Sequence, residues 1–560
     1  MTAHRRRRPL SHRRRAGLRG GRALLAALAG AFLLVGVFAA TGVAGDPFSG
    51  GSRGARPAPA IGTPWSARPD QRPPAADTSG SGAADTGAVP SAPGGGGGAA
   101  DGDGAGQRPP GALPFDLPAP AALRSGKKLV FAHYFTPYPL SLDNASADGD
   151  YYTRNYLTPA GEKGKHARYG GLLRDRPLPT APKSGDWEAA NLREEVRTAV
   201  AAGIDGFTLD LLSLSGPNWE RANRLMEAAR SVDPGFKVML MPDMTSLRTD
   251  DPAVLADALA ALGRAPAAHR LADGRLVVSP FKAEQQSAAW WTGVLDRLKS
   301  KHGIRTAFVP LFLDAGAHSA QFAPISYGFS EWGSRSYVGQ DGAAGDIRRA
   351  HDLGKIWMQP VSVQDARPNQ GIYDEAGNTA TLRSTWTHAI DDGADWVQLT
   401  TWNDYSEGSQ FAPSLHNGHT YLDISSYYLA RFKTGAWPEI VRDTLYLTSR
   451  TQFAAADPTG SQSLVMSLRK GSAAPRDAVE VLSFLTAPAT VRTATGPAKD
   501  AYEAPAGVHA HLLALRPGTS SARVVRDGDS QTAVELPYRV DGTVEVQDLQ
   551  YYGVTSGRTP

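Results

Sequence analysis

The sequence predicts an α/β protein, a (β/α)8 TIM barrel followed by a C-terminal β-sandwich domain. Between residues 127 and 401, eight short apolar segments alternate with segments of helical periodicity, which is typical of parallel βαβ units. Acidic and aromatic residues follow many of the apolar segments, as expected where barrel enzymes carry their chemistry. After residue 443, short alternating segments separated by turn signals predict the sandwich. An open parallel sheet would show the same alternation of apolar and helical segments and is the alternative to the barrel.

The N-terminus predicts export. Nine arginines lie between Arg5 and Arg22, and an uninterrupted apolar run follows over residues 23–44. Small residues at 41–44 suit a signal peptidase, and the run is also long enough to span a bilayer. We therefore interpret residues 1–44 as a signal peptide or membrane anchor. In both cases the rest of the protein is secreted or at the cell surface, and only the anchor would contact a membrane.

Residues 45–125 are expected to be a disordered linker, because Gly, Pro, Ala, Ser and Asp bury too little surface to offset the entropy of ordering. Beyond Arg22 the chain carries 50 Lys and Arg against 55 Asp and Glu, so the formal net charge of +4 comes from the leader. This mildly acidic body argues against a nucleic-acid partner. The absence of cysteine excludes disulfides, thiolate nucleophiles and Cys-ligated zinc.

The catalytic barrel is expected over residues 126–442 and the β-sandwich over 443–560. Asp186 is a typical helix N-cap and Gly203 a typical helix end. Strands are predicted at 127–135, 205–210, 237–243, 275–279, 306–314, 325–329, 355–360 and 396–401. Helices are predicted at 187–202, 219–232, 252–262, 283–300, 345–353, 379–392 and 423–434. Sandwich strands are predicted at 445–448, 463–468, 478–485, 490–495, 508–515, 522–525, 533–536 and 543–546.

The eighth strand leads into a dense group of polar and aromatic side chains. This group consists of Trp402, Asn403, Asp404, Tyr405 and Glu407. A hydrolase acting on carbohydrate needs ring faces for sugars, hydrogen-bonding groups for hydroxyls and two acids to move protons. The alternative is a strand that runs into an ordinary polar loop.

Other strand ends supply further candidate sugar contacts. These are His133, Tyr134, Asp210, Asp243 and Trp332. Each has a structural alternative: a strand-end Asp can cap the next loop, a histidine can lie satisfied in the core, and a tryptophan can fill the end of a barrel. No spacing of His or carboxylate residues indicates a metal site, and no serine triad is evident. We therefore expect no metal and no cofactor.

Several motifs resemble the family 71 glycoside hydrolases, the α-1,3-glucanases often called mutanases. The resemblance extends from about Lys127 to the C-terminus. It rests on residues 130–134 (Val-Phe-Ala-His-Tyr), 201–207 (Ala-Ala-Gly-Ile-Asp-Gly-Phe), 401–407 (Thr-Trp-Asn-Asp-Tyr-Ser-Glu) and 427–435 (Tyr-Tyr-Leu-Ala-Arg-Phe-Lys-Thr-Gly). The third block usually reads Trp-Asn-Asp-Tyr-Gly-Glu-Ser in the family. Here Ser406 and Gly408 replace the Gly and the final Ser, while both acids keep their spacing.

The resemblance implies that Asp404 and Glu407 are the catalytic pair of an inverting hydrolysis of α-1,3-glucan. We assign Glu407 as the acid and Asp404 as the base. The partner is then a polysaccharide, an α-glucan, and the protein is expected to act as a monomer. The alternatives are a glycosidase acting on another α-glycan or on mannan, and a non-catalytic glycan-binding protein of the cell envelope. The C-terminal domain would be a structural cap or a glycan attachment module.

Overall fold

A computed structural model of the protein describes residues 112–247 and 249–558. The expected leader and most of the expected linker lie outside these residues. Within them, no helix is both long enough and apolar enough to cross a membrane. Residues 112–125, expected as linker, are part of the folded structure, because Phe115 is buried and its ring lies 5.2 Å from that of Tyr427. A short helix, α2 (Pro120–Leu123), follows.

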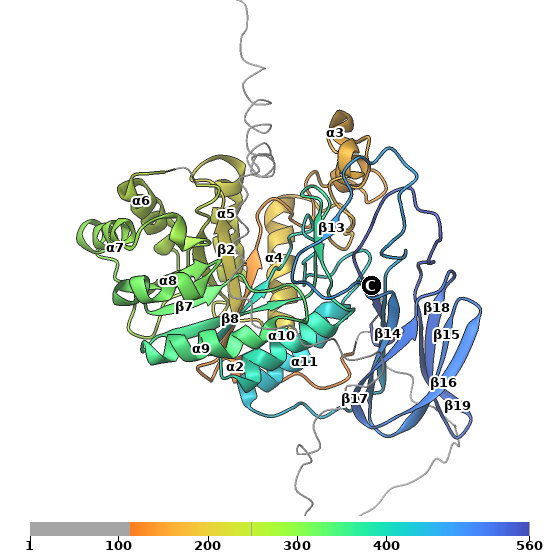
Figure 1. Ribbon diagram of the computed structural model, residues 1–560. Helices are drawn as coiled ribbons and strands as arrows, with labels where there is room; N and C mark the ends of the chain where they lie inside the picture. The colour runs from red at the N-terminus through yellow and green to blue at the C-terminus, as the bar shows by residue number, and fades with distance from the viewer. Residues whose placement is uncertain (1–111, 248, 559–560) are drawn as a thin grey trace, which may run out of the picture. The chain divides into compact units, whose positions relative to one another are not determined.

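A curled parallel sheet of nine strands, counted over the described residues, lies at the centre of the first part of the chain (Figure 1). The strand order is β5-β4-β3-β2-β1-β11-β8-β7-β6, and every neighbouring pair is parallel. The strands are β1 (Leu129–Tyr134), β2 (Gly206–Leu211), β3 (Lys237–Pro242), β4 (Leu276–Val278), β5 (Thr306–Phe308), β6 (Leu311–Phe312), β7 (Gly328–Glu331), β8 (Ile356–Ser362) and β11 (Trp396–Thr400).

The two outer strands of this sheet, β5 and β6, are separated only by Val309 and Pro310. The sequence predicts one strand there, and it splits because proline has no N–H to donate to a ladder. Side chains from distant strands meet on the inner face: Phe131 of β1, Val277 of β4 and Met358 of β8 belong to one hydrophobic cluster. The sheet therefore curls strongly enough to bring its two halves together.

Helices pack against the outer face of the sheet through a much larger hydrophobic cluster. They are α4 (Trp187–Ala201), α5 (Gly216–Val232), α6 (Pro252–Gly263), α7 (Ala288–His302), α8 (Ala315–Phe322), α9 (Ala343–Asp352), α10 (Ala380–Asp391) and α11 (Thr420–Thr434). Asp186 caps α4 as predicted, accepting from the N–H of Ala189 at 3.3 Å. The helix expected at 283–300 starts later, because Ser287 caps α7 by accepting from the N–H of Trp290 at 3.1 Å. Helix α8 was not expected from the sequence.

Short helical turns occupy the long connections of this part of the chain. They are η1 (Tyr152–Tyr156), α3 (Gly161–Gly164) and η2 (Ala167–Tyr169) after β1, and η3 (Ala283–Gln285), η4 (Ala323–Ile325) and η5 (Gln340–Gly342) further along. A connection after β8 carries two further strands, β9 (Asp365–Arg367) and β10 (Ile372–Asp374), which pair in antiparallel register. Neither of these two strands was predicted from the sequence.

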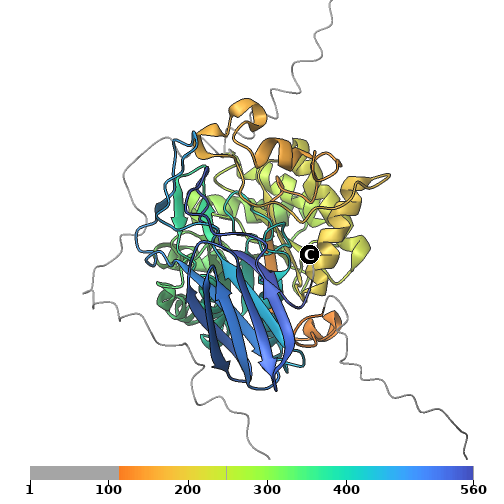
Figure 2. The ribbon, with the colours of Figure 1, turned by 90° about the vertical axis from the view of Figure 1, so that its right-hand side faces the viewer.

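Two antiparallel sheets form most of the C-terminal part, and Figure 2 shows their strands running side by side. One sheet has the order β17-β14-β12-β20 and the other β16-β15-β18-β19, and side chains of both belong to one hydrophobic cluster. The strands are β12 (Thr444–Ser449), β14 (Ala478–Leu485), β15 (Ala489–Thr495), β16 (Ala498–Ala504), β17 (Gly507–Ala514), β18 (Ser520–Arg526), β19 (Asp529–Glu535) and β20 (Tyr552–Thr555).

The C-terminal part differs from the expectation in four places. Strands β16 and β20 were not expected, and residues 543–546 form no strand although one was predicted. The strand expected at 463–468 is reduced to β13 (Ser467–Leu468), and it pairs with β10 instead of joining either antiparallel sheet. The C-terminal part therefore contributes a strand to the connection that follows β8.

Candidate active site

The loop after β11 is folded back on itself by main-chain hydrogen bonds. The N–H of Thr401 donates to Ser409 O at 3.0 Å, and the N–H of Phe411 donates to Thr401 O at 2.9 Å. The N–H of Trp402 donates to His133 O at 2.6 Å and so continues the contact with β1. The peptide bond between Thr400 and Thr401 is cis. This framework holds Asp404 and Glu407 at the carboxyl end of the sheet.

The carboxyl group of Asp404 is held in one orientation. Its Oδ1 accepts from the N–H of Ser406 at 3.0 Å and from the Ser406 hydroxyl at 2.6 Å. Burial raises the pKa of Asp404 to about 6, although the hydrogen bonds from Ser406 and the charge of Arg367 oppose the shift. Ser406 is therefore a direct partner of this acid.

The carboxyl group of Glu407 lies against Arg367, with Oε1 2.7 Å from Nη1. Its Oε2 is buried and has no hydrogen-bond partner among the described residues. Burial raises the pKa of Glu407 to about 7; the Arg367 charge opposes this shift and the Asp404 carboxylate adds to it. The two acids therefore interact electrostatically and titrate as a pair close to neutral pH.

A third carboxyl group and a histidine lie near this pair. Oδ2 of Asp210, from β2, is 3.6 Å from Nε2 of His133, from β1. Burial lowers the pKa of His133 to about 4, so the imidazole is neutral at pH 7. Burial raises the pKa of Asp210 well above its usual range, and the charges of Asp243 and Glu407 add to the shift. Asp210 Oδ1 is buried without a hydrogen-bond partner in the described structure.

Asp243 and Trp332 complete the group. Asp243 follows β3 and accepts from the N–H and hydroxyl of Thr245 at 2.7 and 2.6 Å, so it also shapes its own loop. The Trp332 ring packs edge-on against His133 at 5.1 Å between centroids. Six residues predicted from the sequence are thus neighbours at the carboxyl ends of the strands: His133, Asp210, Asp243, Trp332, Asp404 and Glu407.

The other four predicted residues lie outside this group. The Tyr134 hydroxyl donates to Glu195 on α4 at 2.9 Å, because successive side chains of a strand point to opposite faces and Tyr134 follows His133. Trp402 is buried against Phe207 in the same helix-facing cluster. Tyr405 is buried too, with its ring 6.4 Å from that of Tyr138. Asn403 is bonded to the main chain after β1.

Three charged residues next to the acids were not found from the sequence. Arg367 and Asp365 lie on β9, and Arg335 follows β7, with its guanidinium carbon 4.7 Å from the centre of the Trp332 ring. The signal was the Asp-Ala-Arg sequence shortly after the seventh predicted strand, since alternate residues of an extended segment share one face. Within the described residues, no group of three or more His, Asp or Glu side chains could hold a metal ion.

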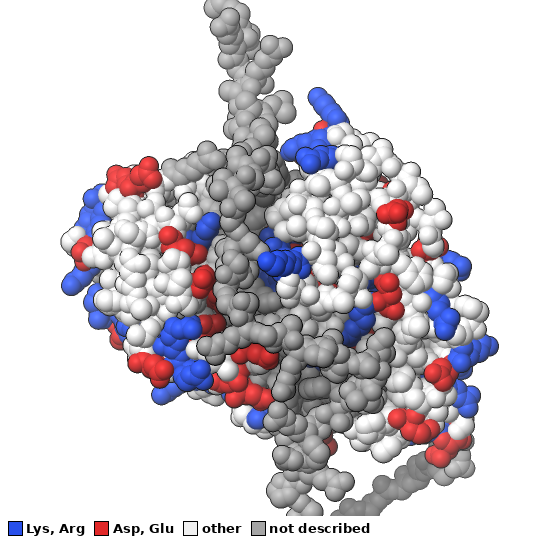
Figure 3. Space-filling view, viewed as in Figure 1, with Lys and Arg blue, Asp and Glu red and all other residues white. Residues whose placement is uncertain are grey.

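A surface cavity lies elsewhere. It has a volume of about 620 Å³ and is lined by Arg275, Tyr327 and Lys355 among others, at the amino ends of the strands. On the face seen in Figure 3, basic and acidic side chains are interspersed. The candidate active site is therefore the cluster of acids around Asp404 and Glu407, at the opposite end of the sheet.

Buried acids at the carboxyl ends of a curled parallel sheet are an arrangement that glycoside hydrolases use. The model of glycosyl hydrolase family 71 matches residues 181–552. This chain belongs to that family.

Two curated relatives are similar over most of their own length. A glucan endo-1,3-alpha-glucosidase of Schizosaccharomyces pombe is 25% identical over 406 residues, covering 66% of this chain and 91% of the relative. A mutanase of Penicillium rubens is 26% identical over 401 residues, covering 66% and 86%. Among solved structures, a GH99 endo-alpha-mannosidase from Bacteroides thetaiotaomicron aligns with a TM-score of 0.43 and 14% identity, covering 55% of this chain and 98% of that one.

Proposed function

We propose that the protein hydrolyses α-1,3-glucan and that Asp404 and Glu407 are its catalytic acids. The observation that carries the proposal is this pair of buried carboxyl groups, three residues apart, whose pKa values are raised to about 6 and about 7. Such values let one group hold a proton while the other is ionised near neutral pH. The activities for which the two relatives are named support the choice of substrate.

The mechanism in this proposal is a single displacement with inversion. Glu407, which has the higher pKa, gives its proton to the glycosidic oxygen as the bond from C1 breaks. Asp404 takes a proton from a water molecule whose oxygen forms the new bond to C1 on the opposite face. Ser406 keeps Asp404 oriented toward that water. The α-linkage thus yields a product with the β configuration, and the protons balance when both acids exchange with solvent.

His133, Asp210, Asp243 and Trp332 form the sugar-binding surface in this proposal. Neutral His133 can donate a hydrogen bond to a glucose hydroxyl, and the carboxyl group of Asp210 can form another. The exposed part of Trp332 offers a ring face. The other four predicted residues do not contact the sugar in this proposal but hold in place the loops that carry these groups; they are Asn403, Tyr405, Tyr134 and Trp402. Asp210 is the alternative to either member of the catalytic pair.

In this proposal the protein folds as a (β/α)8 barrel and is secreted. We infer that β5 and β6 together form the fifth strand of a (β/α)8 barrel, because one pairs with β4 and the other with β7. The two antiparallel sheets are its β-sandwich. An extracellular or wall-associated site of action is supported by the predicted leader and by an ascus wall endo-1,3-alpha-glucanase among the relatives. The protein acts as a monomer without a cofactor in this proposal.

Reducing-sugar release from a panel of polysaccharides tests the proposed function. The full chain is expected to act on insoluble α-1,3-glucan and not on α-1,4-glucan, α-1,6-glucan or mannan. Asp404→Asn and Glu407→Gln should each abolish release while circular dichroism and melting temperature stay close to those of the parent. Release from mannan alone would support the other glycosidase assignment, and pull-down with glucan without release would support a binding protein.

A further inference from the structure

We propose that Arg367 is a positioning residue that fixes the carboxyl group of Glu407, and that the C-terminal part of the chain anchors Arg367. This inference rests on the proposed role of Glu407. It assigns the C-terminal sheets a task in catalysis, in addition to that of a cap or a glycan attachment module.

The guanidinium of Arg367 is shared between two carboxyl groups. Its Nε and Nη2 donate to the two oxygens of Asp365 at 2.7 and 2.5 Å, and Nη1 lies 2.7 Å from Oε1 of Glu407. The bidentate pair with Asp365 fixes the plane of the guanidinium, and hence the direction of the third nitrogen. The main chain of β9 holds Glu407 as well, because the N–H of Ala366 donates to Glu407 O at 2.7 Å.

Strand β9 is connected to the C-terminal part through β10. In the antiparallel β9–β10 pair, Arg367 lies opposite Ile372 and Asp365 opposite Asp374. Strand β10 in turn pairs with β13 of the C-terminal part, and Arg469 donates to Asp374 at 2.8 Å. Arg367 therefore lies on a three-stranded sheet, within the described structure, whose last strand comes from beyond residue 443.

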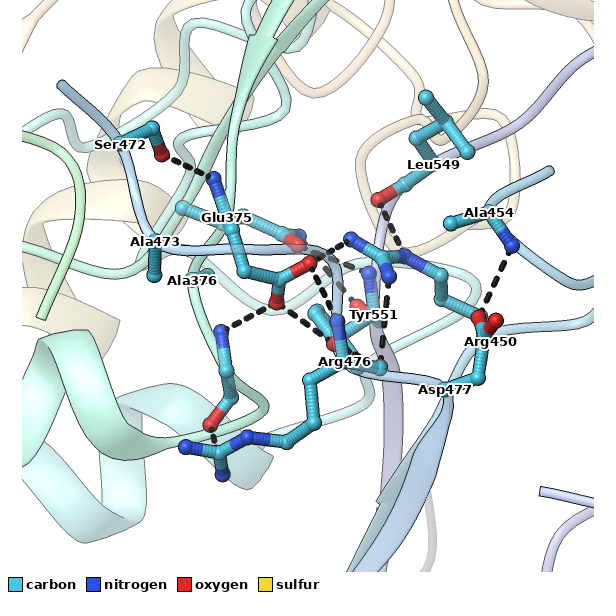
Figure 4. Close-up of polar contacts among 12 residues, drawn as sticks. Glu375, Ala376, Arg450, Ala454, Ser472, Ala473, Arg476, Asp477, Leu549 and Tyr551 are labelled. Atoms are coloured by element: carbon cyan, nitrogen blue, oxygen red, sulfur yellow. Dashed lines mark hydrogen bonds and ion pairs between the residues drawn. The ribbon is translucent and has the colours of Figure 1, made fainter. Parts of the chain in front are cut away.

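A buried network around Glu375 fastens the end of β10 to the C-terminal part (Figure 4). One carboxyl oxygen accepts from the Arg450 guanidinium at 2.7 Å and from the N–H of Arg476 at 3.0 Å. The other accepts from the Tyr551 hydroxyl at 2.7 Å and from the N–H of Gly377 at 2.7 Å. Three of these four donors come from beyond residue 443, so the connection bearing Arg367 cannot shift without breaking buried, charge-assisted hydrogen bonds.

Charged groups from several elements face Glu407. Arg367 and Asp365 come from β9, Asp404 from its own loop, Arg335 from the segment after β7, His133 from β1 and Asp210 from β2. The positive charge of Arg367 lowers the pKa of both Glu407 and Asp404, against the effect of burial. Removal of that charge is therefore expected to move both pKa values upward together.

Three variants separate charge and position from a general loss of stability. Arg367→Lys keeps the charge. Arg367→Gln removes the positive charge. The double variant, Arg367→Gln with Asp365→Asn, removes the positive charge without leaving Asp365 as an unpaired buried charge. Arg383→Gln is the matched control, because Arg383 is also buried and pairs with Glu480 at 3.0 Å, away from the acids.

The experiment is the pH profile of kcat/KM for each variant on the glycan that the parent cleaves, together with urea unfolding. Arg367→Gln should move the profile upward by about one to three pH units. The double variant should move it upward by less, because the Asp365 charge that it also removes raises the pKa of Glu407. Arg367→Lys should keep the parent profile with a lower kcat, because a point charge replaces the bidentate fork. Arg383→Gln should lose stability without a shift. A profile that stays in place in Arg367→Gln and in the double variant would overturn the proposal.

A second readout separates this inference from the proposed function. The carboxyl stretch of Glu407, isolated as the infrared difference between the parent and Glu407→Gln, titrates whether or not the protein cleaves a glycan. Its midpoint should rise in Arg367→Gln and in the double variant. An unchanged midpoint would contradict the proposed role of Arg367 and leave the proposed function untouched. A shifted midpoint in a protein that cleaves none of the polysaccharides would contradict only the proposed function.

Discussion

The side chain of Asn403 forms a reciprocal pair of hydrogen bonds with the main chain of Phe135. Its Oδ1 accepts from the N–H of Phe135 at 2.7 Å, and its Nδ2 donates to Phe135 O at 3.0 Å. Nδ2 also donates to Tyr138 O at 2.8 Å. The side chain of Asn403, the residue before Asp404, thus connects the loop after β11 to the loop after β1, as main-chain hydrogen bonds would in a sheet.

Asn403→Ala is expected to lower both stability and activity. The three main-chain groups lose their buried partner, which costs about 1–3 kcal/mol for each group left unsatisfied. The resulting displacement of the Asp404 loop should lower kcat by up to about a hundredfold. Urea unfolding and initial rates measure the two effects. The matched control is Asn223→Ala, because Asn223 makes a single exposed contact within α5, to Trp219 O at 2.8 Å. Equal effects in the two variants would contradict the role of Asn403.

The activity is expected to have a bell-shaped pH dependence centred between about pH 6 and pH 7. Below about pH 6, Asp404 gains a proton and cannot accept one from water; above about pH 7, Glu407 loses the proton that it must donate. The measurement is kcat/KM on a soluble α-1,3-linked oligosaccharide, with the melting temperature recorded at each pH to exclude unfolding. A rate that rises continuously from pH 5 to pH 9 is incompatible with this pair.

Glu195→Gln is expected to flatten the dependence of stability on pH. Burial raises the pKa of Glu195 to about 8, so the folded protein keeps a proton that the unfolded chain releases above about pH 4.5. This contribution to stability is fully present below pH 4.5 and declines, by about 1.4 kcal/mol per pH unit, until it is lost as the pH passes 8.

The measurement for Glu195 is the free energy of unfolding in urea at pH 5 and at pH 8. The parent should lose more stability over this interval than Glu195→Gln. Glu188→Gln serves as control, because Glu188 is a partly exposed carboxylate on the same helix. The interpretation fails if the parent and Glu195→Gln lose stability equally.

The pair formed by Glu375 and Arg450 is expected to link the C-terminal part to activity. Both side chains are almost completely buried and lie 2.7 Å apart. Glu375→Gln should lower stability by about 3–5 kcal/mol, because Arg450 is left as an unpaired buried charge. Glu375→Gln with Arg450→Met should recover part of the stability but not of kcat, since β10 has still lost its attachment. Full recovery of kcat in the double variant would show that the network serves stability alone.

Hydrophobic periodicity predicted most of the helices and strands of the first part of the chain. It failed where local chemistry interrupts a pattern, as at Pro310, which divides a strand, and at Ser287, which starts a helix late. It also missed β9 and β10, because strands of three residues carry too little periodicity to be recognised. The pairing of β13 with β10 joins segments almost a hundred residues apart and has no local signal.

Most acids of the site could be predicted from the sequence, because each lies at or shortly after the end of a recognisable strand. Asp210, Asp404 and Glu407 are examples. The direction of a side chain was harder to predict: His133 and Tyr134 are adjacent, yet one faces the acids and the other faces α4. Arg367 was missed because its position depends on the pairing of β9, which only the folded chain reveals.

The most direct test of the account is time-resolved NMR of the first product released from an α-1,3-linked gluco-oligosaccharide. The parent should release the β-anomer before mutarotation equilibrates the signals. Asp404→Asn and Glu407→Gln should reduce its rate of appearance by about 10²- to 10⁴-fold. Initial release of the α-anomer, or full activity in either variant, would contradict an inverting reaction carried out by this pair.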